Sequence, residues 1–235
     1  MSMDEKLKKL YEEYWPRYQT YIRYSEAAKN AAYPFLIKCP DSYEVAEKRI
    51  MFCGQETQGW YTKGYNDPDV DYHDLRGCYN AFVNGINNAV VNKEQGKNSP
   101  YWNFQKRIRN AFPKIAFIRN NIVKIGKRRA PGCDDRVNDL TLKYFPVITK
   151  EIEILEPDLI IFFTGPKYDS RIEKVLGSFS EEHIDERFEC WDRLEFKNSN
   201  IPSAIRLNHP GWLVRNRLYN SMVEAVCSYI KHFYA

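Results

Sequence analysis

Two side chains that can act as an acid–base pair each follow an apolar segment of this sequence. Glu56 comes three residues after the apolar run 49–53, and His209 comes directly after the segment 202–208. A carboxylate can orient a water molecule or stabilise a developing cation, and an imidazole can donate a hydrogen bond to an anionic leaving group. Each residue also has a structural alternative. Glu56 could cap a helix or lie solvated in a loop, and His209 could bond a backbone carbonyl.

Amide and basic side chains occur together after a second apolar run. Asn120 and Asn121 follow the run 115–118, and an amide can read the edge of a nucleobase or simply mark a turn. Lysines and arginines surround this pair and hold most of the excess positive charge. They could bind phosphates, or form a solvated face. The residues are Arg107, Arg109, Lys114, Arg119, Lys124, Lys127, Arg128 and Arg129.

Two large apolar residues, Trp212 and Leu213, stand just after Pro210 and Gly211, which indicate a loop. Exposed apolar side chains in such a loop can insert into a duplex and unstack it. The alternative is that they anchor the loop on the C-terminal helix.

The polar residues need a scaffold, and apolar runs predict one. Strands are expected at 49–53, 115–118, 159–163 and 202–207, each uniformly apolar, which is typical of a parallel sheet covered on both faces. Ligands bind at the carboxyl ends of such strands. We therefore expect a three-layer α/β/α fold with a central, mostly parallel four-stranded sheet. A short strand at 194–196 lies in the otherwise irregular region 178–200.

Helical periodicity accounts for much of the remaining chain. We expect helices at 4–24, broken or kinked at Pro16, at 76–92, at 101–111, at 139–155 with an interruption at Pro146, at 169–176 and at 216–233. The whole chain, 1–235, is expected to be one domain, with 1–45 as a helical extension packed on it.

Composition excludes several classes of protein. The 235 residues carry 35 Lys and Arg against 31 Asp and Glu, a net charge of +4, and the apolar runs are far shorter than the roughly 20 residues that span a bilayer. None of the six cysteines forms a CxxC pair, so we expect no metal and no cofactor. No signal peptide is visible, so we expect an intracellular, cytoplasmic protein, and a monomer.

Five segments in this order resemble motifs of the uracil-DNA glycosylase superfamily. Ile50–Thr57 is similar to the strand and first motif of that family (GQDPYH or GEAPG), and Leu207–Leu213 is similar to its second (HPSPLS). Between them, Tyr101–Lys106, Asn121–Lys124 and Glu156–Gly165 are similar to an S-L-x-N-I-x-K-E-L helix, an N-L-V-K segment and a P-x-hydrophobic-G strand.

The resemblance implies a glycosylase that flips a damaged base out of DNA and hydrolyses its N-glycosidic bond. Glu56 would orient water and stabilise the sugar cation, and His209 would donate to the departing base. The implied base pocket comprises Gly54, Gln55, Trp60, Asn120, Asn121 and Gly165. The implied DNA contacts are Pro210, Gly211, Trp212 and Leu213, the last as a wedge, with Lys124, Lys127 and Arg128.

The first motif departs from the family at Thr57-Gln58-Gly59, where the family has Pro-Tyr-His, so Trp60 or Tyr61 would have to replace the tyrosine that excludes thymine. Glu56 also adds a methylene group where the family has Asp. Two alternatives follow from these differences. The chain could be a catalytically weak or inactive nucleic-acid- or nucleotide-binding module of the same fold, or a hydrolase of free nucleosides or nucleotides.

Overall fold

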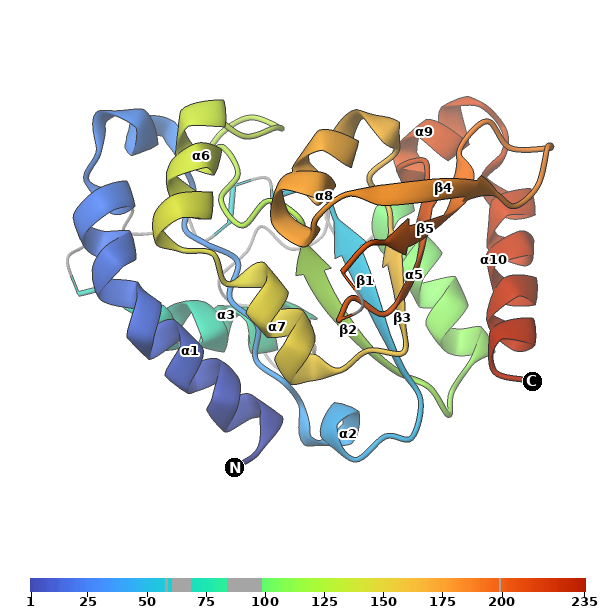
Figure 1. Ribbon diagram of the computed structural model, residues 1–235, viewed down its shortest axis with the longest axis horizontal. Coiled ribbons are helices and arrows are strands. Elements are labelled where there is room, and N and C mark those ends of the chain that lie inside the picture. Colours follow the sequence, from blue (N-terminus) through green and yellow to red (C-terminus); the bar gives the residue numbers. More distant parts are fainter. Residues whose placement is uncertain (58, 61–68, 84–98, 199) are drawn as a thin grey trace.

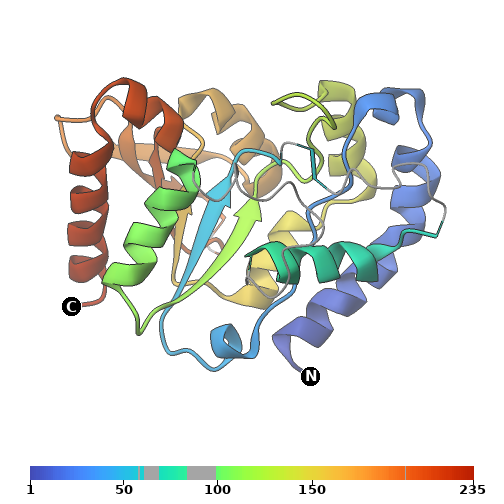
Figure 2. The ribbon, with the colours of Figure 1, turned by 180° about the vertical axis from the view of Figure 1, so that it is seen from behind.

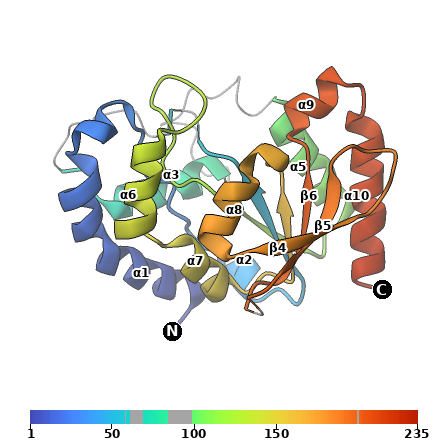
Figure 3. The ribbon, with the colours of Figure 1, turned by 45° about the horizontal axis from the view of Figure 1, so that its top comes forward.

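A central sheet of six strands organises the protein. The computed structural model describes residues 1–57, 59–60, 69–83, 99–198 and 200–235. The strands are arranged in the order β2-β1-β3-β6-β5-β4. Figure 1 labels β1 to β5, and Figure 3 labels β6 beside β5. Their bounds are β1 (Arg49–Gly54), β2 (Ala116–Asn121), β3 (Leu159–Phe162), β4 (Phe179–His183), β5 (Trp191–Phe196) and β6 (Ser203–Leu207).

Four neighbouring strands, β2, β1, β3 and β6, are parallel, as their apolar sequences predict. β3 has all four residues buried, and in β1 only Arg49 is not fully buried. A strand covered on both faces needs apolar side chains on both, which explains the absence of alternation. The register pairs Gly54 with Asn121, so two polar strand ends lie side by side.

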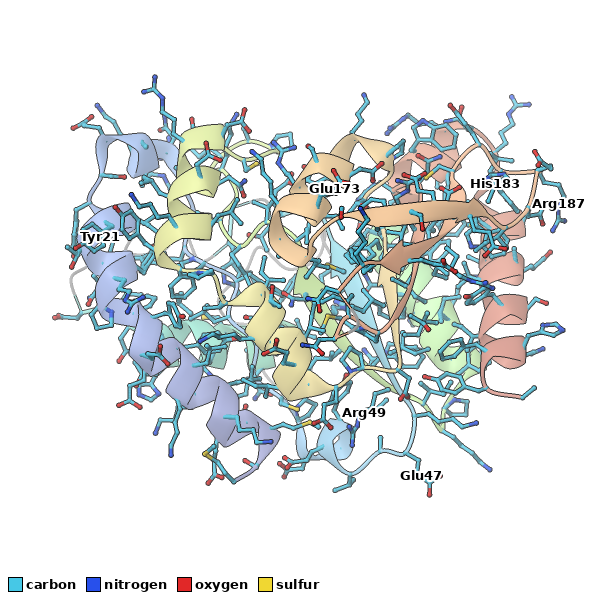
Figure 4. All side chains as sticks on the ribbon, in the orientation of Figure 1. Tyr21, Glu47, Arg49, Glu173, His183 and Arg187 are labelled. Atoms are coloured by element: carbon cyan, nitrogen blue, oxygen red, sulfur yellow. The ribbon has the colours of Figure 1, made fainter. Side chains whose placement is uncertain are left out.

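The prediction of a four-stranded sheet was incomplete, because a β-hairpin extends the sheet. β4 pairs antiparallel with β5, and β5 pairs antiparallel with β6. The sheet is therefore mixed. The sequence did not reveal β4 because it reads Phe-Ser-Glu-Glu-His, and all its residues after Phe179 are exposed. Figure 4 places His183 and Arg187 on this hairpin, far from Tyr21.

Helices cover both faces of the sheet, so the protein has three layers. Ile50 and Phe52 of β1 point into one apolar core, while Met51 and Cys53 point into the other. The Met51 core contains α1 (Met3–Tyr18), α3 (Tyr72–Val83), α6 (Asp135–Tyr144), α7 (Ile148–Leu155) and α8 (Asp169–Leu176). The Ile50 core contains α5 (Pro100–Ala111), α9 (Pro210–Arg215) and α10 (Tyr219–Phe233). Figure 2 shows α5 and α10 together, away from α1.

The helix predictions hold with four changes. α1 continues through Pro16 to Tyr18, and only then does a π-helical segment, η1 (Gln19–Arg23), follow. The segment 139–155 is two helices, α6 and α7, separated around Pro146. α9 replaces the loop expected after His209. α5 matches its prediction closely because Ser99 caps it and Pro100 occupies its first turn. The helix expected at 76–92 begins earlier, as α3, and residues 84–92 lie outside the described part.

The first 45 residues pack against the other elements. Besides α1 and η1 they form a 3-10 helix, η2 (Glu26–Asn30), and α2 (Asp41–Glu44). Leu7, Tyr11 and Ile22 are completely buried in the core that α7 shares. None of the described helices is both long and apolar enough to cross a membrane.

Candidate functional site

The carboxyl ends of the parallel strands form one edge of the sheet, and the predicted site residues gather there. α8 and α9 begin near this edge, where they follow β3 and β6. In Figure 3 the molecule is turned so that this edge of the sheet comes toward the viewer. Backbone hydrogen bonds join the strand ends, from the Ile122 amide to the Gly54 carbonyl and from the Gly165 amide to the Leu207 carbonyl. Arg49, labelled in Figure 4, lies at the opposite edge.

Glu56 is held by two donors from two different segments. Its Oε1 accepts a hydrogen bond from the Gly132 amide at 2.8 Å, and its Oε2 accepts one from the Tyr168 hydroxyl. Tyr168 belongs to a 3-10 turn, η3 (Pro166–Tyr168), which directly follows β3. Burial and the neighbouring Glu56 carboxylate raise the pKa of Tyr168, so its hydroxyl remains a donor. The carboxylate is therefore fixed, while part of its accepting capacity remains unused.

His209 is the N-cap of α9, and one hydrogen bond shows which of its ring nitrogens carries the proton. Its Nδ1 accepts a hydrogen bond from the Gly211 amide at 3.1 Å. An accepting Nδ1 carries no proton, so the neutral ring bears its proton on Nε2. Burial, assisted by the charge of Arg215, lowers the pKa of His209. The residue is thus a neutral imidazole with an N–H to donate.

Tyr101 connects His209 to the end of β1. Its ring lies parallel to the His209 ring, with centroids 5.6 Å apart. A Cβ atom at Gly54 would come within 2.6 Å of the Tyr101 hydroxyl and 2.5 Å of Asn121 Oδ1, so only glycine leaves room for both. The side chain of Asn121 has no hydrogen-bond partner among the described residues and lies beside Tyr101. Gly54, Asn121 and His209 are therefore all neighbours of Tyr101, and Gly54 and Asn121 are themselves buried.

Three further predicted pocket residues have identifiable positions. Gln55 donates from Nε2 to the Thr164 carbonyl at 2.8 Å, which links the ends of β1 and β3. Gly165 has a φ of 64°, a conformation that favours glycine. Trp60 is only 3% exposed and packs between Phe35 and Phe82, so it is not free to stack on a base. Tyr61, the other candidate, lies outside the described residues.

Asn120 and Lys124 are not at the site but in a closed polar cluster beneath it. Lys124 Nζ lies 2.6 Å from Glu151 Oε2, and both side chains are 0% exposed. Asn120 donates to the same carboxylate and accepts from Lys124, while Tyr11 donates to Glu151 Oε1 at 2.6 Å. The predictions that Asn120 reads a base and that Lys124 binds DNA are wrong, because neither side chain can reach a ligand.

The segment after His209 is the helix α9, so Leu213 does not lie in a loop from which it could insert into DNA. Leu213 is 1% exposed and belongs to the core formed with α10, so the structural alternative is the correct one. Pro210 is buried, and Gly211 and Trp212 are half-buried. The exposed apolar residue on α9 is Val214, with 47% of its surface accessible.

A basic surface adjoins Glu56. A hollow of about 770 Å³ is lined by residues 126–130 together with η2 and the start of α6. Lys127, Arg128 and Arg129 line it, and Gly126, which also lines it, lies against Glu56. The sequence holds ten basic and no acidic residues from 95 to 133. Lys127 and Arg128, two of the predicted DNA contacts, share this hollow with the acidic residues Glu26, Asp134 and Asp135.

Two tyrosines of the site, Tyr101 and Tyr168, escaped sequence reasoning. Tyr101 begins the segment Tyr101–Lys106 that resembles a family motif, but nothing assigns it a role among 17 tyrosines, and Tyr168 is marked only by following a strand end and a Gly-Pro turn. Among the described residues, no group of three His, Cys, Asp or Glu side chains could hold a metal ion. The arrangement offers a fixed carboxylate, a neutral imidazole donor and an amide.

The chain matches no known family model and no curated protein.

Proposed function

We propose that this protein is a DNA glycosylase that hydrolyses the N-glycosidic bond of uracil or a related deaminated base flipped out of DNA, as in base excision repair. The observation that carries the proposal is that Glu56 and a His209 whose proton is on Nε2 follow the carboxyl ends of β1 and β6, at the same edge of the sheet. The motif resemblance and the parallel strand order β2-β1-β3-β6 support it.

Each of the two groups has a task in such a reaction. The bond between C1′ and the base nitrogen breaks with its electron pair going to the base. His209 stabilises the resulting anion by donating from Nε2. Water adds to C1′ while Glu56 orients it, stabilises the positive sugar and accepts its proton. Glu56 then returns that proton to solvent, from which the released base takes one, leaving an abasic site.

Substrate binding falls to the surrounding residues in this proposal. Asn121 presents an amide with unused donor and acceptor capacity next to Tyr101 and His209, which suits the edge of a pyrimidine or its deaminated analogues. Lys127 and Arg128 would contact the flanking phosphates. Val214, exposed on α9, takes over the wedge role first assigned to Leu213.

A cleavage panel tests the proposal. Single- and double-stranded oligonucleotides carrying uracil, hypoxanthine or xanthine are incubated with the protein and then with alkali, which cuts at abasic sites. We expect cleavage of at least one substrate and a loss of about 100-fold or more in Glu56→Gln, because general acid–base groups contribute 10²–10⁴-fold. Glu153→Gln, which changes an exposed glutamate on α7, is the matched control.

The other outcomes separate the alternatives. Absence of cleavage from every oligonucleotide contradicts the proposal. If salt-dependent DNA binding then persists, the protein is a binding module of this fold. If free nucleosides or nucleotides are hydrolysed instead, the site acts on small substrates.

A further inference from the structure

We infer that Tyr168 is a positioning residue for Glu56, whose carboxylate it holds in place through its hydroxyl. The inference rests on the proposed function and deepens it, because it identifies the residue that orients Glu56 for its proposed role in base release. Tyr168 does not need to touch the substrate. It acts through the carboxylate of Glu56, to which it donates.

The geometry restrains the carboxylate at both oxygens. Tyr168 comes from the turn after β3, and Gly132 comes from the segment after β2, so the donors approach Glu56 from separate elements. The Gly132 segment is itself anchored, since the Lys127 amide donates to the Gly132 carbonyl and the Arg128 amide donates to the Asn30 carbonyl. Rotation of the Glu56 carboxylate would break its hydrogen bond with Gly132, with Tyr168, or with both.

Tyr168 is in turn fixed by its surroundings. Its amide donates to the Gly165 carbonyl, and its ring is partly buried against the core. The Arg171 guanidinium lies 4.9 Å from the ring centroid, and Arg171 pairs with Asp135 at 2.9 Å. The hydroxyl is therefore presented by a rigid support.

A glutamate needs such support more than a shorter acid does. Its side chain has one more rotatable bond than aspartate, and misplacing a reacting group by about 1 Å can cost 100-fold in rate. Two donors fix the longer side chain. A carboxylate held in one orientation can stabilise a cationic sugar at a fixed position.

The test measures how strongly the site prefers a positive charge in the sugar position. DNA duplexes carry either a cationic pyrrolidine or a neutral tetrahydrofuran in place of one nucleoside, and the ratio of their dissociation constants is measured. We expect the wild type to bind the cationic duplex at least tenfold more tightly. Tyr168→Phe, which removes only the hydroxyl, should reduce that ratio at least fivefold. In the Glu56→Gln background, the same change should have no further effect.

Tyr234→Phe is the matched control. The Tyr234 hydroxyl also donates to a carboxylate, that of Asp158, at 3.1 Å, but at the opposite edge of the sheet. The Tyr234→Phe variant should keep the wild-type ratio, and similar melting curves of the two variants would show that loss of a hydroxyl does not alter the fold.

The possible failures are distinguishable. A wild-type ratio of one overturns the proposed function and this inference with it. A wild-type preference that Tyr168→Phe leaves intact overturns the inference alone. A loss that occurs equally in the Glu56→Gln background also overturns it, because Tyr168 would then act independently of Glu56.

Discussion

Two polar clusters lie close together at the ends of β1 and β2, and they differ in whether their hydrogen-bonding capacity is used up. In the closed cluster of Tyr11, Asn120, Lys124 and Glu151, each side chain is paired and buried. In the site, Glu56 and His209 are only partly covered, and Asn121 has no side-chain partner among the described residues. Adjacent asparagines, 120 and 121, therefore belong to different clusters.

The difference separates a structural role from a functional one. Burial lowers the pKa of Lys124 and raises that of Glu151, so burial opposes both charges, and the contacts between them, with the hydrogen bonds from Tyr11 and Asn120, offset it. Such a cluster cannot give up a contact to a ligand. The site has donors and acceptors to spare, which is what substrate binding requires. The predictions below test this contrast, from the largest effect to the smallest.

Removing one member of the closed cluster should destabilise the fold strongly. Lys124→Met leaves the Glu151 carboxylate buried without its cation, and breaking a buried pair in this way costs about 3–5 kcal/mol. Urea unfolding measures the free energy. A loss below 1 kcal/mol would contradict the view that this cluster is closed. The double variant Lys124→Met/Glu151→Leu should recover much of the loss, since both charges are gone.

His209 belongs to the site and not to the closed cluster, so its removal should affect activity far more than stability. We expect His209→Ala to lower the rate of base release at least tenfold, because the anionic base loses its donor. His232→Ala, on the exposed face of α10, is the control. Unchanged single-turnover rates on the best substrate of the cleavage panel would refute the role.

Acid should inactivate the site through His209, and the direction is fixed by its environment. Burial lowers the pKa of His209 below its usual 6.5, and only the neutral ring can accept from Gly211 while donating from Nε2. The rate should therefore persist below pH 6.5 and fall only at the lowered pKa. An acidic limb in the pH–rate profile at or above pH 6.5 that disappears in His209→Asn would contradict this.

The same shift has a stability consequence. Between the lowered pKa of the folded state and the usual 6.5 of the unfolded state, the unfolded chain binds a proton at His209 that the folded chain does not. The free energy of unfolding therefore falls as the pH falls through this range, and the contribution of His209 to stability is fully present only above it. Melting curves of wild type and His209→Asn across these pH values measure it.

The smallest effect should distinguish a lysine that lines the hollow from an exposed lysine at the opposite edge of the sheet. Lys127→Ala removes a half-buried cation that lines the hollow, so the negative slope of log K against log salt for DNA binding should become less steep by about 0.9. Lys114→Ala, exposed just before β2 at the opposite edge, should leave the slope unchanged. Equal effects of both variants would show that DNA does not select this surface.

The sequence predicted the parallel strands and the strand-end residues well, because uniform apolar runs leave few alternatives. It could not reveal which polar residues have partners far away in the chain. Nothing near Lys124 indicates that Glu151 and Tyr11 will bury it, so a lysine in a basic stretch resembled a DNA contact. Leu213 was misplaced because Pro-Gly suggests a loop, whereas Pro210 starts α9 with His209 as its cap.

The hydrogen bond from Tyr11 to Glu151 spans 140 residues of sequence and has a consequence for biogenesis. During synthesis, α1 leaves the ribosome long before its partner exists. The closed cluster can form only after α7 has emerged, because Glu151 belongs to that helix. Such a non-local contact is slow to form, and it leaves the apolar face of α1 without its partners until then. Nascent chains stalled before residue 151 should therefore be sensitive to proteases throughout.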